Sequence, residues 1–208
     1  MENKLVILAS GRGSNFAAIA NAIADGSIPN ARIIALISNN ADAGAIGIAK
    51  RLGIAVRIIH SKNFRQSGQF DRIGYEKELS AVLKELQPNW ILLAGYMLIL
   101  GKEIIQQWAN KIVNIHPSLL PAFRGLRAQK QAIEAGVSKS GCTVHFVTEE
   151  LDDGPIIAQN TVEVLGTDTE ETLSQRLLPI EHHTYVEAVS KLCSRSCVIR
   201  NGCVEWLA

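Results

Sequence analysis

The sequence has no excess of positive or negative charge, and it has no long apolar run. Its 21 basic and 20 acidic residues leave a net charge of +1 over 208 residues, and neither sign gathers in a tail. We predict no nucleic-acid partner, because nucleic-acid surfaces concentrate Lys and Arg. The longest apolar run, residues 90–100, contains Gly95 and is shorter than the roughly 20 residues needed to cross a bilayer. We therefore predict no membrane partner either.

Cysteines are few, and no leader segment is evident. The four cysteines, at 142, 193, 197 and 203, show no two-residue metal spacing. We predict no metal site, with Cys193, Cys197 and Cys203 as the alternative ligand set. The first apolar run ends at Ser10 and is too short for the core of a signal peptide, so we expect a cytoplasmic protein.

The sequence does contain ample material for a core, with 47% hydrophobic and 20% charged residues. Apolar runs alternate with helix-period segments, which is typical of βαβ units and predicts one α/β domain over 1–208. The predicted strands are 4–9, 32–37, 55–59, 89–94 and 111–115, and the predicted helices are 15–24, 43–51, 70–86 and 102–108. A loop is expected over 116–129, followed by a short helix to 135, strands at 142–147 and 156–164, and a helix from 169 to about 192, capped by Asp168.

A glycine-rich turn, Ser10-Gly11-Arg12-Gly13-Ser14-Asn15, follows the first strand and opens a helix. Backbone N–H groups at such a helix start bind phosphate, and glycine lets the ligand approach closely. The alternative is a plain turn in which Ser14 or Asn15 caps the helix. The turn lacks the third glycine of a dinucleotide fingerprint and the Gly-Lys-Ser/Thr of a Walker loop, so a monophosphate fits better.

Asn114 and His116 end a predicted buried strand, in the run Asn114-Ile115-His116-Pro117-Ser118-Leu119-Leu120-Pro121. The two side chains share a face because side chains alternate along a strand, and ligands gather at this edge of an α/β sheet. Asp152 lies in a turn between two later strands. An amide, an imidazole and a carboxylate that meet can stabilise an oxyanion and move a proton, as acyl transfer to an amine requires.

Two other functions remain open from these residues. A nucleotide-binding module without catalysis would use the glycine turn alone and would not need Asn114, His116 and Asp152 to converge. A metal hydrolase would use Asp152, Asp153, His116 and His145, although no pair of them has the i, i+4 spacing of ligands on one helix. We expect His145 to support the site from behind the catalytic residues, because it alternates with Phe146 along a strand.

Taken together, these segments resemble the family of glycinamide ribonucleotide formyltransferase, folate-dependent enzymes of purine biosynthesis. Besides the run that starts at Asn114, the resemblance rests on Gly11-Arg12-Gly13-Ser14-Asn15 and His145-Phe146-Val147-Thr148-Glu149-Glu150-Leu151-Asp152-Asp153-Gly154-Pro155, in the family's order and spacing. It implies a Rossmann-like, mostly parallel sheet with helices on both faces, mixed at its carboxy-terminal part. A half over about 1–100 would bind the nucleotide phosphate, and a half over about 101–208 would hold the folate and the catalytic groups.

The resemblance also implies a reaction and its residues. The formyl group of 10-formyltetrahydrofolate, a co-substrate, would pass to the amine of glycinamide ribonucleotide without a metal. Asn114 and His116 would stabilise the oxyanion, while Asp152 would tune His116 and relay a proton. The implied substrate-binding residues are Gly13, Ser14, Asn15, Pro117 and Glu181, and the implied folate-binding residues are Arg72, Met97, Leu98, Ile99, Leu100, Asn114, Val147, Thr148 and Glu149. The partners would be small molecules, and the protein a monomer or a homodimer.

Three stretches depart from the family's pattern. Leu98 stands where arginine is common, Leu178 and Pro179 replace polar residues ahead of Glu181, and Arg124-Gly125-Leu126-Arg127 replaces Pro-Gly-Leu-His. Methionyl-tRNA formyltransferase and formyltetrahydrofolate hydrolase resemble this core too. The first carries a carboxy-terminal RNA domain and the second an amino-terminal regulatory domain, and we expect neither here.

Overall fold

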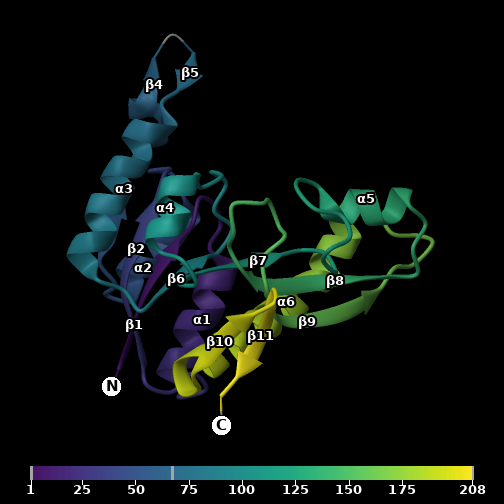
Figure 1. Cartoon of the computed structure of the whole chain (residues 1–208). Helices are drawn as coiled ribbons and strands as arrows, with labels where there is room; N and C mark the ends of the chain where they lie inside the picture. Colours follow the sequence, from purple (N-terminus) through teal and green to yellow (C-terminus); the bar gives the residue numbers. More distant parts are fainter. Residues whose placement is uncertain (1, 67, 208) are drawn as a thin grey trace.

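A seven-stranded sheet forms the centre of the molecule (Figure 1). The computed structural model describes residues 2–66 and 68–207, and the strand order in this sheet is β3-β2-β1-β6-β7-β8-β9. The parallel strands are β1 (Asn3–Leu8), β2 (Ala31–Ser38), β3 (Val56–Ile58), β6 (Trp90–Leu93) and β7 (Ile112–His116). β8 (Lys139–Phe146) is antiparallel to β7, and β9 (Ile156–Glu163) is antiparallel to β8. The predicted sheet, parallel first and mixed later, is confirmed.

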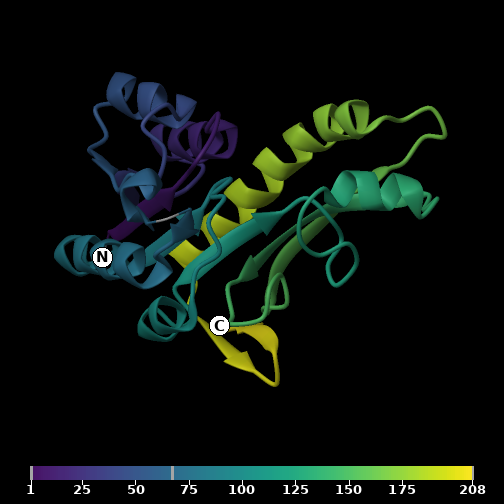
Figure 2. The same ribbon diagram turned by 90° about the horizontal axis from the view of Figure 1, so that it is seen from above.

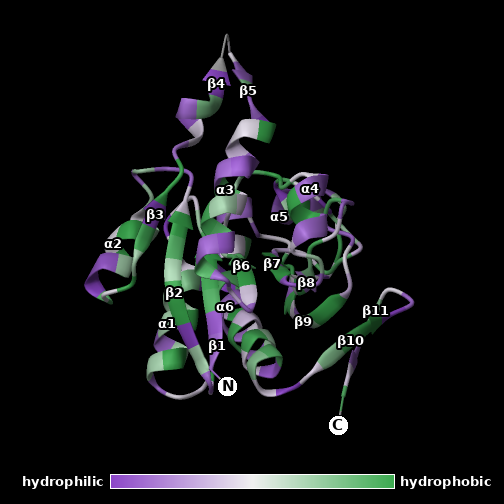
Figure 3. Cartoon of the chain, turned by 60° about the vertical axis from the view of Figure 1, so that its left-hand side comes forward, coloured by the Kyte–Doolittle hydropathy of each residue, from purple (hydrophilic) through white to green (hydrophobic). Residues whose placement is uncertain are grey.

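Helices cover both faces of this sheet (Figure 2). One face carries α1 (Ser14–Ala24), α2 (Gly44–Arg51) and α6 (Glu170–Ser194), and the other carries α3 (Arg72–Leu86) and α4 (Lys102–Gln107), while α5 (Ala128–Glu134) contacts α6. Strand β1 is buried on both sides, because Leu5 and Ile7 pack into one core and Val6 and Leu8 into the other. Figure 3 shows hydrophobic colour along the central strands. Burial on both faces explains why the strands read as continuous apolar runs.

The starts of two helices differ from the prediction. The helix predicted near residues 70–86 begins at Arg72, because the Asp71 side chain caps it by accepting a hydrogen bond from the Gly74 N–H at 2.9 Å. Helix α6 is capped by Thr169, whose hydroxyl accepts from the Thr172 N–H at 3.2 Å. Asp168, the predicted cap, instead accepts from the Leu165 N–H at 2.8 Å and pairs with Arg176.

Two small hairpins were not predicted. A 3₁₀ turn, Ser61–Phe64, leads into β4 (Arg65–Gln66) and β5 (Gln69–Phe70), which lie beyond the start of α3 (Figure 1). The second hairpin pairs β10 (Cys197–Arg200) with β11 (Cys203–Trp206) after α6. Its turn residues Asn201 and Gly202 have φ of 51° and 75°. An Asn-Gly pair between apolar residues is a hairpin signal, so the sequence did carry this information.

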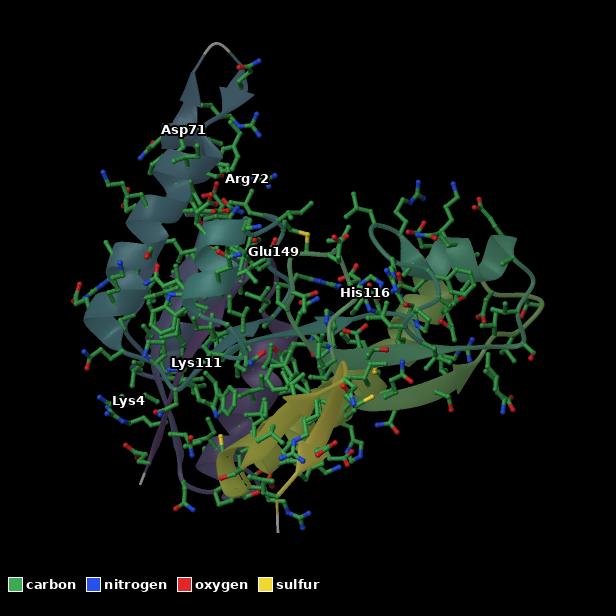
Figure 4. The ribbon with its side chains drawn as sticks, in the orientation of Figure 1. Lys4, Asp71, Arg72, Lys111, His116 and Glu149 are labelled. Carbon is green, nitrogen blue, oxygen red and sulfur yellow. The ribbon has the colours of Figure 1, made fainter. Side chains whose placement is uncertain are left out.

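The sheet reverses its strand order between β1 and β6. From β1 the chain moves outward to β2 and β3 and then crosses to β6, on the other side of β1. The turns after β1 and β6 therefore leave in opposite directions and open a crevice at their carboxyl ends. In Figure 4, Lys4 and Lys111 lie toward the amino ends of β1 and β7, whereas His116 lies at the carboxyl end of β7. The crevice thus faces the end of the sheet that carries His116.

Candidate active site

A cavity of about 570 Å³ lies at this reversal point. Its volume is within the usual range of small-molecule sites. The turn after β1, the turn after β6 and one side of α6 form its wall, whose residues are Gly11, Arg12, Gly13, Ser14, Asn15, Ala94, Gly95, Met97, Gln129, Glu171, Ser174, Gln175, Leu178 and Glu181. Four of the five predicted substrate-binding residues are among them. Pro117 is not, and it lies half-buried where the loop after β7 begins.

The start of helix α1 opens onto this cavity. Gly13 precedes the helix in a left-handed conformation, with φ 82°, and no side chain caps the helix. The alternative in which Ser14 or Asn15 is the cap is therefore wrong, since the helix already begins at Ser14. First-turn N–H groups without a cap are free to bind an anion, helped by the helix dipole.

The Asn15 side chain faces Glu181 across the cavity wall. Its Nδ2 donates to Glu181 Oε2 at 3.1 Å, while its Oδ1 is buried and accepts no hydrogen bond within the described part of the chain. Burial raises the pKa of Glu181, and the bond from Asn15 and the charge of Arg12 oppose that shift. A buried carbonyl oxygen without a donor is uncommon in proteins. The pair therefore offers acceptors to a ligand that brings its own O–H or N–H groups.

His116 is buried between two acceptors. Its Nδ1 lies 3.2 Å from Asp152 Oδ2, and its Nε2 lies 3.0 Å from the Phe123 carbonyl oxygen. The two side chains are only 7% and 9% exposed. Both contacts become hydrogen bonds only when both ring nitrogens carry a proton. The predicted pair of imidazole and carboxylate is present. The other ring nitrogen, Nε2, was expected to be free to donate to a substrate, but it contacts the Phe123 carbonyl because the loop after β7 folds back over the ring.

Asp152 joins this loop to the turn between β8 and β9. Its Oδ2 accepts a second hydrogen bond, from the Gly125 N–H at 2.9 Å. The neighbouring Asp153 points elsewhere and pairs with Arg124. Arg124 and Arg127, which depart from the family's pattern, thus have partners on the protein, Arg127 pairing with Glu170 at 2.6 Å. Asp152, and not Asp153, faces the histidine.

Asn114 is held by a residue of the neighbouring strand. In the register of β7 and β8 it lies directly opposite His145. His145 Nδ1 donates to the Phe146 carbonyl at 2.9 Å, so its Nε2 can accept from Asn114 Nδ2 at 3.3 Å. Burial lowers the pKa of His145, which keeps the ring neutral and suited to this role. Asn114, His116 and Asp152 therefore form one cluster, which we call the Asn-His-Asp cluster, with His145 behind it.

Known proteins share this sequence and fold. Residues 3–189 match the model of the formyl transferase family. This chain belongs to that family. It is 38% identical over 207 residues to the human "Trifunctional purine biosynthetic protein adenosine-3". The match spans 98% of this chain but only 20% of that protein. It is also 38% identical over 195 residues to "Phosphoribosylglycinamide formyltransferase, chloroplastic" of Arabidopsis thaliana. This match spans 91% of this chain and 65% of that protein.

A solved structure extends the likeness to the fold. The crystal structure of glycinamide ribonucleotide transformylase 1 from Symbiobacterium toebii superimposes with a TM-score of 0.92 at 38% identity, over 100% of this chain and 95% of the other. The formyl transferase family and the fold predicted from the sequence are thereby confirmed. The chain spans about a fifth of the human relative and about two thirds of the plant one.

In this chain, the residues predicted to bind folate are only partly accessible. Met97 and Ile99 are exposed by 67% and 56%, whereas the Leu100 side chain is 7% exposed and lies in the core beside α3 and α4. Leu98 is half-buried against the same core. The Leu100 side chain points into the core because the segment turns inward to begin α4, so the prediction that residues 97–100 line a folate cleft stays a prediction that rests on their backbone groups.

The other predicted folate residues come from two segments. Arg72 is exposed at the start of α3, and Val147 is half-buried against the second core. Thr148 Oγ1 donates to the Glu150 carbonyl at 3.2 Å. The Glu149 carboxylate accepts from Gln106 at 2.7 Å and pairs with Lys102 at 3.2 Å, so α4 already holds it. The polar side chains of this turn thus have partners on the protein, and its backbone groups are the ones expected to contact a ligand.

Sequence reasoning missed much of the cavity wall. Glu171, Ser174, Leu178 and Glu181 line the cavity together, and they recur every three or four residues along α6. That spacing places them on one side of a helix. Knowing that Glu181 faced the site was therefore enough to find the others. No such signal marked Gln129, which the first turn of α5 brings to the cavity.

Two features are absent from residues 2–66 and 68–207, a metal-binding group and a membrane-spanning helix. In that part of the chain no three His, Cys, Asp or Glu side chains are grouped as a metal site would require. No helix there has the length and apolar character for a membrane crossing. All four cysteines are free.

Proposed function

We propose that this chain transfers the formyl group of 10-formyltetrahydrofolate to the amine of glycinamide ribonucleotide. The observation that carries the proposal is the Asn-His-Asp cluster beside the cavity at the start of α1. The two are adjacent, because Asn114 pairs with Leu93 of β6 and the next residue, Ala94, lines the cavity. The names of the Arabidopsis and Symbiobacterium relatives, a phosphoribosylglycinamide formyltransferase and a glycinamide ribonucleotide transformylase, support the choice of substrate.

The nucleotide substrate fits the cavity in one direction. Its phosphate binds at the uncapped start of α1, through the N–H groups of Ser14 and Asn15. Its ribose hydroxyls donate to Glu181 and to Asn15 Oδ1, which lacks a donor. This places the amine toward the turn after β6, beside Asn114.

The folate binds on the side of the crevice that carries Met97 and Ile99. Their exposed apolar side chains cover one face of the pterin, and backbone groups of residues 97–100 and 147–149 read its polar edge. In Figure 4, Arg72 and Glu149 both lie above the sheet, on the side to which α3 projects. Arg72, exposed at the start of α3, binds the acidic end of the folate.

Transfer begins when the amine nitrogen attacks the formyl carbon and negative charge builds on the formyl oxygen. Asn114 has two N–H groups, and only one is used toward His145, so the second donates to this oxygen. His116 donates from Nε2, where the oxyanion replaces the Phe123 carbonyl. The exchange is favourable because a charged acceptor forms a hydrogen bond about twice as strong as a neutral one.

The intermediate then collapses, and the bond between the formyl carbon and N10 of the folate breaks. The amine has lost one proton and N10 must gain one. Asp152, held by His116 and the Gly125 N–H, takes the proton through a water molecule and returns it to N10. The same carboxylate keeps the His116 ring oriented.

A direct assay tests the proposal. The protein is incubated with glycinamide ribonucleotide and 10-formyltetrahydrofolate, and mass spectrometry follows the formylated ribonucleotide while absorbance follows tetrahydrofolate. We expect both products in equal amounts, and both to form at least about a hundredfold more slowly with Asp152→Asn protein. Formate without formylated ribonucleotide would instead indicate a hydrolase, and product formed only on methionyl-tRNA would indicate the other formyltransferase.

Several predictions lie outside this assay. A cytoplasmic location, a monomer or homodimer, metal independence and the absence of nucleic-acid and membrane partners stay predictions. The name of the Arabidopsis relative places that protein in the chloroplast. Fractionation, light scattering and activity after chelation measure the first three.

A further inference from the structure

Two consecutive residues of α3, Tyr75 and Glu76, hydrogen-bond to the segment between β6 and α4, residues 95–101. The hydroxyls of Tyr75 and Tyr96 form a hydrogen bond at the first end of the segment. At the other end, Glu76 Oε1 accepts from the Gly101 N–H at 2.6 Å. Consecutive helix residues point about 100° apart, which lets this pair reach two separate points. We call Tyr75 and Glu76 the α3 clamp.

The contact at Gly101 is unusually close. Gly101 has φ −86°, which any residue adopts, so the backbone conformation does not require glycine. A Cβ at this position would lie 2.8 Å from Glu76 Oε2 and 3.1 Å from Oε1. Any larger residue at position 101 would have to push the Glu76 carboxylate aside, so this contact favours glycine.

Burying the Glu76 carboxylate costs desolvation free energy that an exposed carboxylate does not lose. It is 7% exposed, and Gly101 is its only hydrogen-bond donor within the described part of the chain. Burial raises its pKa, and the bond from Gly101 and the charge of Arg72 oppose the shift. Burial also raises the pKa of Tyr75 to about 12. Buried polar groups of this kind are retained where they fix a particular geometry.

The segment held in this way is the one that faces the crevice. Ser10 Oγ accepts from the Met97 N–H at 2.8 Å, so the turn after β1 fixes a third point. Between these points Met97 and Ile99 remain exposed. We propose that the α3 clamp positions residues 97–100 for the folate, so that Glu76 sets the affinity for the formyl donor without touching it. The proposal rests on the proposed function for the identity of the ligand.

Binding of tetrahydrofolate, followed by calorimetry, tests this proposal. Glu76→Ala removes the acceptor, and Gly101→Ala pushes the carboxylate aside without backbone strain. Each is expected to weaken tetrahydrofolate binding about tenfold, the usual effect of losing a hydrogen bond to a charged group. Because both variants break one contact, the double variant should bind no more weakly than Glu76→Ala alone. Glu76→Gln keeps an oxygen acceptor and should recover most of the affinity.

Controls on the same helix separate positioning from stability. Leu83→Ala removes a side chain that is 1% exposed, so it lowers the melting temperature but should leave tetrahydrofolate affinity unchanged. Glu78→Gln changes an exposed charge and should change neither. In steady-state kinetics, the clamp variants should raise KM for 10-formyltetrahydrofolate and leave KM for glycinamide ribonucleotide within about threefold of wild type.

The outcomes distinguish this proposal from the proposed function. Formyl transfer with unchanged tetrahydrofolate affinity in folded Glu76→Ala and Gly101→Ala proteins would overturn the clamp alone. Equal increases in both KM values, or additive losses in the double variant, would also overturn it. Tetrahydrofolate binding that follows the expected pattern, in a protein that forms no formylated ribonucleotide, would support the clamp and overturn the proposed function. A wild-type protein that does not bind tetrahydrofolate would overturn both.

Discussion

Asn114 Nδ2 lies 3.3 Å from Nε2 of His145, the residue directly opposite it on the neighbouring strand. The histidine is 2% exposed, and its other nitrogen is tied to the Phe146 carbonyl. The contact therefore orients the Asn114 amide and leaves its second N–H for the formyl oxygen in the proposed reaction. Under the proposed function, His145 is therefore expected to be a positioning residue that acts through Asn114.

Removing this acceptor should slow the reaction more than it weakens binding. We expect His145→Leu to lower kcat about tenfold or more and to change both KM values little, since the oxyanion exists only after attack. His145→Gln offers a carbonyl acceptor and should retain more activity. Initial-rate kinetics measures this, with circular dichroism to confirm folding. Equal kcat values for His145→Leu and wild type would mean that Asn114 does not need the contact.

The buried His145 should also make stability depend on pH. Burial lowers its pKa below the ordinary 6.5, so as pH falls below about 6.5 the unfolded chain takes up the proton before the folded one. The free energy of unfolding should therefore decrease as pH falls from about 6.5 toward the lower pKa of the folded state. Urea titrations at pH 7.5 and 5.5 measure the decrease, which should be smaller in His145→Gln. His182 shares the direction of shift and retains part of the slope, and His183→Gln, at an exposed position, is the control.

The two adjacent aspartates should behave very differently. Asp152→Asn keeps an acceptor for the Gly125 N–H but removes the charge beside His116. We expect kcat to fall by about 10²–10⁴, with little change in either KM. Asp153→Asn breaks only a partly exposed pair with Arg124 and should stay within about threefold of wild type. A large loss at Asp153 with none at Asp152 would contradict the proton path proposed above.

The fold was predictable because its signals are local. The strands are continuous Ile, Val and Leu runs, and β1 is fully buried from Leu5 to Leu8. Alternation along one strand also sufficed to place Asn114 and His116 on the same side. The contact of Asn114 with His145 was not predictable, since it depends on the register of β8, which long-range pairing sets. The contact of His116 with the Phe123 carbonyl likewise depends on how an irregular loop folds.

Gly13 shows how a sequence motif can suggest a misleading experiment. From the sequence, Gly13→Val is expected to raise KM for glycinamide ribonucleotide by blocking the phosphate. In the structure a Cβ on Gly13 would lie 2.7 Å from both Cα and Cβ of Ala45, and φ is +82°. The substitution would therefore disturb the packing of α1 against α2 before it affected a ligand. A residue beside Gly13 makes a cleaner test.

Arg12 is that residue. Among the side chains that line the cavity, all in the described part of the chain, it is the one cation, and Glu171 and Glu181 are the anions. Leu178 adds no charge, although a polar residue is usual there in the family. A doubly charged phosphate near two carboxylates is disfavoured unless a cation offsets the repulsion. Arg12 is exposed, so its replacement leaves the core intact.

We therefore expect Arg12→Gln to raise KM for glycinamide ribonucleotide about tenfold or more, the effect of losing charge-assisted hydrogen bonds to phosphate. KM for 10-formyltetrahydrofolate and kcat should change little. The matched substrate is glycinamide riboside, which lacks the phosphate and should react equally poorly with wild type and Arg12→Gln. Arg32→Gln, which breaks an exposed pair with Glu2 at the start of β2, is the control for loss of a positive charge elsewhere. If Arg12→Gln raised KM for the riboside as much as KM for the ribonucleotide, the arginine would not be binding the phosphate. The charge would then have to be offset by the helix start alone.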